Sequence, residues 1–356
     1  MDETSTAGPL VVTGDGRLLD GLLRLAAATG ASPQVVGRDE VPEVRRTWAT
    51  TPLVLLGDDC AGPLAGLRLP RREGVLLVTA APDEPAVWRR AVAAGADQVV
   101  SLPADHELVA DLLGACADGP AGAPVVCVVG GCGGAGASVF ASALAVAAAA
   151  GGARTVLVDA DAWGGGLDLV VGVEHADGLR WADLAATSGR VSARSLRDLL
   201  PRVGDLSVLT WHRDAAVPVP ADSMRAVATA AQRGHDLVVV DVPRHLDAAA
   251  EEVLVRATHT VLVVPAEVRA VAAAAPVVAA LARVATATGL VVRTLGPAGL
   301  DAALVAESLG LPLLARMRVE RGLVEALDQG LGPLRHRRGP LARASAQVLA
   351  AVGVPR

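Results

Sequence analysis

The chain has 356 residues, a length typical of two domains, and 52% of them are hydrophobic, enough for two buried cores. Its formal net charge of -6 argues against a surface built as a whole to bind nucleic acid. The sequence contains no lysine, so all 32 of its Lys-plus-Arg side chains are arginine.

The cysteines and the N-terminus indicate the compartment. Four cysteines occur without a C-x-x-C pair, namely Cys60, Cys116, Cys127 and Cys132. Zinc and iron–sulfur sites need clustered thiolates, so we expect free thiols in a reducing cytosol. The N-terminal "MDETSTAGPL" is acidic and lacks the apolar core of a secretory signal. We therefore expect a cytoplasmic protein.

The first part of the chain alternates short apolar runs with helical patterns. Strands are predicted at 9–14, 32–37, 51–57, 74–80 and 97–103. Helical segments lie between them, such as 18–30 and 84–96. This order predicts a flavodoxin-like doubly wound domain over residues 1–115.

The stretch "VLLVTAAPDEPAVWRRAVAAGADQVVSLPAD" resembles the second half of a response-regulator receiver domain, with Thr79-Ala80 and Pro103 at receiver positions. The resemblance implies a magnesium site made by clustered acids, a phospho-accepting aspartate and a lysine. Leu102 stands at the position of that lysine.

The acids of this receiver-like site are also incomplete. Asp15 is one acid where two are usual, and Asp58 and Asp59 leave the identity of the acceptor open. We expect a solvated loop acid rather than a phospho-acceptor at Asp58. The domain is therefore predicted to be a pseudo-receiver that offers surfaces for docking or dimerisation.

Small residues, glycine and proline follow without periodicity in "ACADGPAGAP". This composition predicts a linker at 116–124 and a second domain at 125–356.

The second domain opens with a buried strand, "VVCVV", a glycine-rich loop and a strong helix former, "ASVFASALAVAAAA". The loop matches the phosphate-binding pattern G-x-x-x-x-G-K-[ST] except at the lysine. Glycines allow backbone N–H groups to surround an anion, and the helix N-terminus adds its dipole. The predicted nucleotide-binding residues are Gly131, Cys132, Gly133, Gly134, Ala135, Gly136, Ala137, Ser138 and Val139.

Two later strands end in aspartates. Asp159 and Asp161 follow "RTVLV", and Asp241 ends "HDLVVVD". An aspartate after an apolar strand is how a Walker B strand reaches Mg²⁺. Ser138 and Asp241 are the predicted metal residues.

These stretches, with "TVLVVPAEVRAVAAA", resemble the MinD/ParA group of deviant Walker A ATPases. The pseudo-receiver and "VDADAWGGGLDLVVG" narrow the resemblance to the CpaE/TadZ branch, and "GGCGGAGAS" to its septum site-determining (Ssd) proteins. The resemblance implies a P-loop NTPase fold with a parallel sheet, ATP or ADP with Mg²⁺, and a homodimer. It also implies that Asp159 and Asp161 lie where the family positions its attacking water, which makes them the catalytic candidates.

The family loop reads K-G-G-x-G-K-[ST], and both of its lysines are replaced here, by Cys132 and Ala137. The resemblance implies that the first lysine reaches the partner's nucleotide and that the second binds phosphate in its own subunit. Relatives place an asparagine near the adenine after a late strand, where Val292-Arg293 stands here. Arg244, after the Walker B strand, is the nearest arginine by sequence that could compensate.

The stretch "LPRVGDLSVLTWHRD" is predicted to be a strand leading to the segment that faces a dimer partner. Three tryptophans, Trp163, Trp181 and Trp211, are candidates for that face, with core packing as the alternative. The last helix, "GPLARASAQVLAAVG", is short and alanine-rich, so we expect only weak membrane contact from it. The basic "RHRR" before it could meet DNA or an acidic partner, or solvate the helix start.

The sequence thus predicts a cytoplasmic spatial regulator that positions or inhibits septum formation and binds nucleotide with weak or no hydrolysis. Its predicted partners are proteins of the division or Tad secretion and pilus machinery, with recruitment to septum, pole or membrane surface, and nucleic acid is not expected. Two alternatives stay open: an active ATPase that localises a Tad/Flp pilus or secretion apparatus, and a docking protein that binds no nucleotide.

Overall fold

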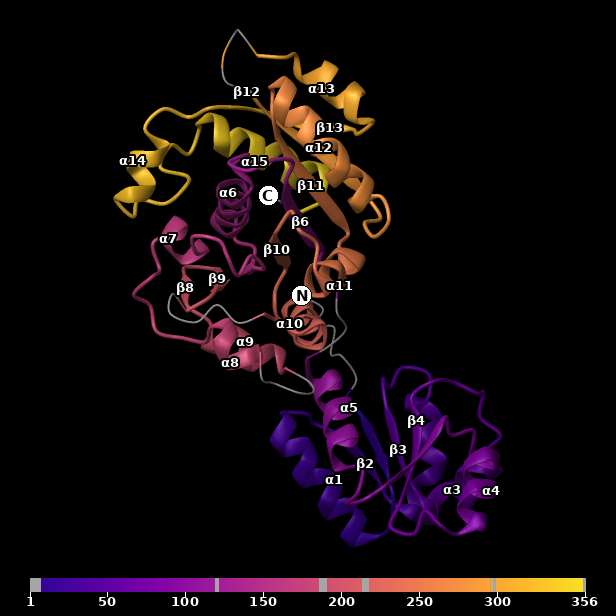
Figure 1. Ribbon diagram of the computed structural model, residues 1–356. Coiled ribbons are helices and arrows are strands. Elements are labelled where there is room, and N and C mark those ends of the chain that lie inside the picture. The colour runs from indigo at the N-terminus through magenta and orange to yellow at the C-terminus, as the bar shows by residue number, and fades with distance from the viewer. Residues whose placement is uncertain are drawn as a thin grey trace. The chain divides into compact units, whose positions relative to one another are not determined.

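A computed structural model describes residues 8–118, 122–185, 191–212, 218–294, 296 and 299–354 (Figure 1). The chain divides into two compact units, Met1–Pro120 and Ala121–Arg356. Each unit has its own sheet and its own hydrophobic clusters.

The N-terminal unit is a five-stranded parallel sheet in the order β2-β1-β3-β4-β5. This is the flavodoxin-like order that the sequence predicts. Its strands are β1 (Leu10–Val12), β2 (Gln34–Val36), β3 (Val54–Gly57), β4 (Val75–Thr79) and β5 (Gln98–Ser101). Its helices are α1 (Gly16–Thr29), η1 (Arg38–Glu43), α2 (Val44–Thr47), α3 (Asp58–Gly66), α4 (Pro85–Ala94) and α5 (His106–Asp118).

The segment between the units is shorter than the predicted linker. Helix α5 continues to Asp118, and residues 119–121 lie outside the described residues. On the other side, Ala123 N donates to Gln232 O, and Pro124 O accepts from Val238 N. Residues 123 and 124 are therefore tied to the C-terminal unit.

The C-terminal unit is an eight-stranded sheet in the order β13-β12-β11-β6-β10-β7-β9-β8. All neighbouring strands are parallel except β8 and β9. The strands are β6 (Val125–Gly130), β7 (Thr155–Asp159), β8 (Arg202–Val203), β9 (Leu206–Leu209), β10 (Leu237–Val242), β11 (His259–Pro265), β12 (Thr288–Thr294) and β13 (Leu313–Arg318). The helices are α6 (Ala137–Ala150), α7 (Leu167–Val171), α8 (Trp181–Ala185), α9 (Ala193–Leu199), α10 (Ala221–Gly234), α11 (Ala248–Arg256), α12 (Val268–Leu281), α13 (Ala302–Leu309), α14 (Leu323–Asp328) and α15 (Pro340–Ala351).

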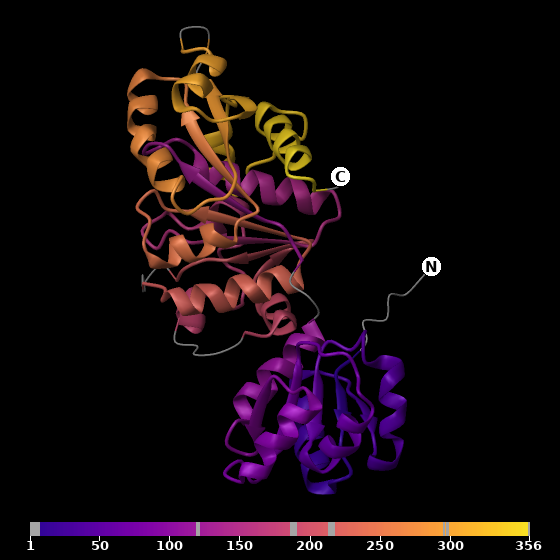
Figure 2. The ribbon, with the colours of Figure 1, turned by 90° about the vertical axis from the view of Figure 1, so that its right-hand side faces the viewer.

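Helices cover both faces of this second sheet, which explains why its central strands are apolar on both sides. Helices α6 and α15 pack on one face and α10, α11 and α12 on the other, each over a separate hydrophobic cluster. Figure 2 shows α12 (orange) on the opposite side of the sheet from α6 (magenta) and α15 (yellow). The fold therefore brings the carboxyl ends of β6, β10, β7 and β12 to one edge.

The structure decides between the two interpretations of the tryptophans, and it limits what the last helix can contact. Trp181 and Trp211 are buried and pack on each other with ring centroids 5.9 Å apart, so neither lines an exposed face. Of the three tryptophans, only Trp163 is exposed, at 86%. The apolar side of α15, including Leu341 and Val348, is buried in the core and is not free to contact a membrane.

Among the described residues, no helix combines the length and the apolar character that crossing a membrane requires. The apolar stretch at residues 270–292 is divided between α12 and β12.

Candidate functional site

The glycine-rich loop joins β6 to α6 at the predicted place. Gly134 and Gly136 have φ angles of 68° and 91°, which side chains with a Cβ rarely adopt. Gly136 is the N-cap of α6, and its carbonyl accepts from Phe140 N. The loop therefore ends where the free N–H groups of a long helix begin, the arrangement that receives anions.

The start of the loop is held by close packing. Gly131 N donates to Val263 O at 2.9 Å. A Cβ added to Gly131 would lie 2.7 Å from Val264 Cγ2 and 2.9 Å from Ala274 Cβ. Glycine is therefore required at position 131 by the approach of β11 and α12.

The two predicted metal residues lie together. The Ser138 hydroxyl donates a hydrogen bond to the Asp241 carboxylate on the neighbouring strand β10. Burial raises the pKa of Asp241 to about 7, the bond from Ser138 acts against this rise, and the charges of Asp159 and Asp161 add to it. The site thus holds a desolvated carboxylate next to a hydroxyl, which are ligands that suit Mg²⁺.

Asp159 is buried and extensively hydrogen-bonded. Its Oδ2 accepts from Thr210 Oγ1 at 2.9 Å and from Leu167 N at 3.2 Å, and its Oδ1 accepts from Asp161 N at 3.1 Å. Burial raises its pKa to about 7 against these bonds. Its carbonyl also accepts from Trp181 Nε1 at 2.6 Å. Asp159 therefore organises the loop after β7.

Asp161 lies in that loop and is half-buried. Its Oδ1 accepts from Trp163 N at 3.1 Å, which closes a short turn. Asp161 thus has a more accessible carboxylate than Asp159, and it lies close in the turn to Trp163, whose side chain is exposed.

Two arginines reach the glycine-rich loop. A Cβ built on Gly136 would lie 3.5 Å from Arg293 Nη1, and one built on Gly133 would lie 3.9 Å from Arg244 Nη2. The Nε of Arg293 is buried and has no hydrogen-bond partner among the described residues. Burial raises the pKa of the Cys132 thiol, while the positive charges of Arg244 and Arg293 act to lower it.

The sequence pointed to Arg244 and missed Arg293 as a neighbour of the phosphate loop. Arg293 and Gly136 are 157 positions apart along the chain, yet strand β12 is separated from β6 by β11 alone. The available signal was the place of Arg293 near the end of a late strand, because the carboxyl ends of parallel strands share one edge.

Among the described residues, no group of three or more His, Cys, Asp or Glu side chains is placed to hold a metal ion. Mg²⁺ commonly takes one or two protein ligands and completes its coordination with phosphate oxygens and water. Ser138 and Asp241 fit that kind of site, and the glycine loop beside them fits the phosphates.

The acids of the receiver-like site are engaged within the N-terminal unit. Asp58 forms a bidentate pair with Arg90, at 2.6 and 2.5 Å. Asp59 accepts from Thr13 Oγ1 at 2.8 Å and from Gly14 N at 2.7 Å. These carboxylates are used in structural contacts, and Asp58 is not simply a solvated loop acid.

A comparison with known proteins finds a relative that matches nearly the full length of the chain. The chain is 44% identical over 340 residues to Rv3660c, an uncharacterized protein of Mycobacterium tuberculosis H37Rv, covering 94% of this chain and 95% of that one. The chain belongs to the Rv3660c family. Residues 12–124 match the family described as the Rv3660c-like, CheY-like N-terminal domain, and residues 123–280 match that described as cellulose biosynthesis protein BcsQ.

Solved structures show the fold of the C-terminal unit in this Rv3660c-family chain. A ParA family ATPase from Chlorobium tepidum has a TM-score of 0.58 at 16% identity, covering 65% of this chain and 98% of that one. The septum site-determining protein MinD from Pyrococcus horikoshii, complexed with Mg-ADP, has a TM-score of 0.55 at 18% identity. The match covers 65% of this chain and 96% of that one. The chain thus combines a CheY-like domain with a ParA/MinD-like P-loop NTPase domain.

Proposed function

We propose that this protein is a MinD/ParA-type spatial regulator that binds ATP or ADP with Mg²⁺ and hydrolyses ATP weakly or not at all. The observation that carries the proposal is the convergence of Arg293 and Arg244 on a glycine-rich loop that lacks both family lysines.

Arg293 is the better substitute for the missing lysine. Its Nη1 lies beside Gly136 at the start of α6, and its buried Nε has no partner within the described structure. A phosphate would satisfy the guanidinium with charge-assisted hydrogen bonds. Such bonds contribute about 1.5–3 kcal/mol each, which corresponds to roughly ten- to hundredfold in affinity.

Weak hydrolysis follows from the same site. Cys132 is neutral and supplies no charge to a second subunit, and the carboxylate of Asp159 is occupied by three hydrogen bonds. Asp161 is then the carboxylate better able to orient a water. Ser138 and Asp241 would hold Mg²⁺, whose charge offsets that of the phosphates when bound.

The cellular role in this proposal is to position or inhibit the division septum as a homodimer. It is supported by the resemblance of "GGCGGAGAS" to the septum site-determining proteins and by the fold shared with MinD. The exposed Trp163, next to Asp161 in the turn after β7, suits a face that meets a second subunit.

The test is titration with a fluorescent ATP analogue and Mg²⁺. We expect Arg293→Ala to weaken binding at least tenfold, and Arg283→Ala, at an exposed position after α12, to leave it unchanged. Adding Ala137→Lys to Arg293→Ala should restore binding, because a lysine at the family position would again supply a positive charge to the loop.

Circular dichroism establishes that each variant is folded. If the unmodified protein binds no nucleotide, the docking-protein alternative is the better account. If it binds and Arg293→Ala has no effect, then Arg293 is not the substitute for the lysine.

A further inference from the structure

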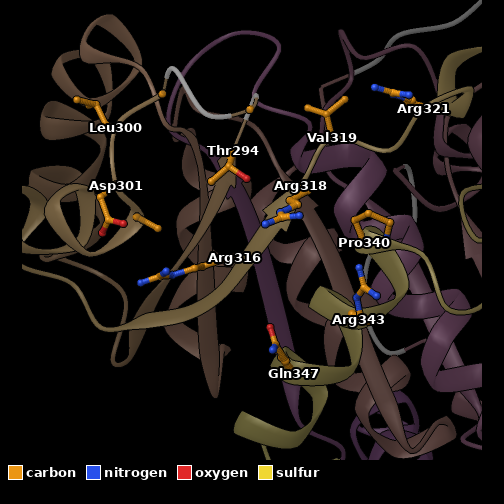
Figure 3. Close-up of a pocket in the computed structure, with 13 residues that line it drawn as sticks. Thr294, Leu300, Asp301, Arg316, Arg318, Val319, Arg321, Pro340, Arg343 and Gln347 are labelled. Carbon is orange, nitrogen blue, oxygen red and sulfur yellow. The ribbon is translucent and has the colours of Figure 1, made fainter.

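A hollow of about 590 Å³ lies in the N-terminal unit, between α1 and the carboxyl ends of β3, β4 and β5. We call it the α1 hollow. A second hollow, of about 1030 Å³ in the C-terminal unit, is lined in part by Thr294 and Arg318 (Figure 3). Thr294 directly follows Arg293, so that second hollow belongs to the candidate nucleotide site. The α1 hollow is separate from it, and its volume is in the range of small-molecule sites, about 300–1,000 Å³.

One side of α1 forms a wall of the α1 hollow. Arg17, Gly21 and Arg24 all line the hollow, and their spacing of four and three residues places them on one face of the helix. Both arginines are exposed, and among the described residues neither guanidinium has a hydrogen-bond or ion-pair partner. This wall therefore presents two unpaired positive charges to the hollow.

Gly21 leaves open space between these two arginines. A Cβ added to Gly21 would meet nothing within 4 Å, and its φ is not positive. Neither close packing nor backbone conformation therefore requires glycine, although glycine destabilises the interior of a helix relative to alanine. The space that a side chain at position 21 would fill is part of the hollow.

The wall opposite α1 is mostly apolar. Ala80 and Ala81 come from the loop after β4, and Leu102 follows β5. The Thr79 hydroxyl at the end of β4 already accepts from Ala81 N at 3.1 Å. Because Leu102 stands where receivers carry a lysine, this wall offers a contact for an apolar group and no positive charge.

The acids of the α1 hollow limit the charge of a ligand. Asp15 caps α1, and its Oδ1 accepts from Arg17 N at 2.8 Å and Leu18 N at 3.3 Å. Asp58 and Asp59 are held by the contacts described above. The charges of Asp15 and Asp59 would still repel an anion with several charges. The hollow therefore favours a ligand with one negative charge directed at α1.

Guanidinium groups bind carboxylates through paired N–H donors. We propose that the α1 hollow binds a small organic monocarboxylate, with its carboxylate between Arg17 and Arg24 and its apolar body against Ala80 and Leu102. This ligand class differs from the metal ion and phosphoryl group of a receiver site. The proposal concerns the N-terminal unit alone, so it does not depend on whether the glycine-rich loop binds nucleotide.

Isothermal titration of the full chain with octanoate tests the proposal. We expect octanoate to bind, and we expect its neutral amide and inorganic phosphate to bind at least tenfold more weakly. Arg17→Gln with Arg24→Gln should weaken octanoate binding at least tenfold, because the pair removes both positive charges. Arg89→Gln, at an exposed position on α4, is the matched control that retains binding.

A second variant tests the space rather than the charge. Gly21→Leu fills the hollow between the two arginines and should also weaken octanoate binding at least tenfold. Gly66→Leu adds the same side chain at the exposed end of α3, where a Cβ would meet nothing within 4 Å, and should leave binding unchanged. Circular dichroism establishes that each variant is folded.

The proposal would be overturned if the unmodified chain did not bind octanoate, or if it bound the amide equally well. Equal octanoate binding by the arginine pair and by Arg89→Gln would also contradict it. Tighter binding of inorganic phosphate than of octanoate would mean that the hollow keeps the ligand of a receiver site, which the proposal excludes.

Discussion

At the residue scale, the pKa of an aspartate shifts in opposite directions in the two units. In the receiver-like site, burial acts to raise the pKa of Asp59, but hydrogen bonds from Gly14 and Thr13 outweigh it and lower that pKa. In the candidate nucleotide site, burial dominates and raises the pKa of Asp241 to about 7. Hydrogen bonds within the N-terminal unit stabilise the charged form of Asp59. The charged form of Asp241 lacks enough such bonds, and a bound cation would stabilise it.

The N-terminal unit should therefore not accept phosphate. Asp58 is paired with Arg90, Asp59 is bound by Thr13 and Gly14, and Leu102 stands where receivers carry lysine. We expect no added phosphate in intact-mass analysis after incubation with acetyl phosphate and Mg²⁺. A phospho-aspartate at Asp58 or Asp59 would contradict the pseudo-receiver interpretation.

A second residue-scale prediction concerns pH. Burial lowers the pKa of His235 to about 4, whereas the unfolded value is 6.5. The unfolded chain therefore binds the proton first, and stability present above pH 6.5 is lost as pH falls toward 4. At about 1.4 kcal/mol for each unit of pKa difference, the free energy of unfolding falls by roughly 3 kcal/mol.

Urea unfolding of the protein and of His235→Gln at several values between pH 7 and pH 4 measures this effect. The amide does not titrate, so the stability advantage of the histidine should shrink as the pH falls. A constant difference between the two proteins would show that His235 is not the cause.

At the element scale, the phosphate loop is shaped by its neighbours as much as by its own glycines. Gly131 is packed against β11 and α12, whereas a Cβ on Gly133 would meet only Arg244 Nη2 at 3.9 Å. Neither residue has a positive φ. The two glycines thus differ in the space around them rather than in access to the left-handed region.

We expect Gly131→Ala to lower the free energy of unfolding by about 1–3 kcal/mol, as overpacking does. Gly133→Ala should change it little and serves as the matched control. Thermal or urea denaturation of both variants checks this. Equal stability of the two would mean that β11 and α12 can move apart at no cost.

At the scale of the whole molecule, the two units have separate cores, and the segment between them is short. Elastase, which cleaves after small residues, should cut first between Asp118 and Ala123 and leave a stable C-terminal fragment. The fragments are identified by mass. An initial cut within 125–260 would argue against two independent units.

The sequence by itself determined most strands, most helices and the place of the glycine-rich loop. Runs such as residues 125–129 and 137–150 have one strong local preference, and β6 and α6 form there. The segment around β8 and β9 is predicted as a single strand but forms a hairpin, because its two short strands give no separate apolar pattern. The two motifs also predicted that Ser138 and Asp241 lie together, and the structure joins them by a hydrogen bond; their role at Mg²⁺ stays a prediction.

Only the tertiary structure decided which side chains meet across the sheet. Arg293 and Gly136 lie far apart in the sequence, and the order of β12, β11 and β6 brings them together. The burial of α15 likewise removes its apolar side from membrane contact. The hydrophobic pattern of a helix or strand indicates which face is buried. Which element covers that face depends on the strand order and on packing.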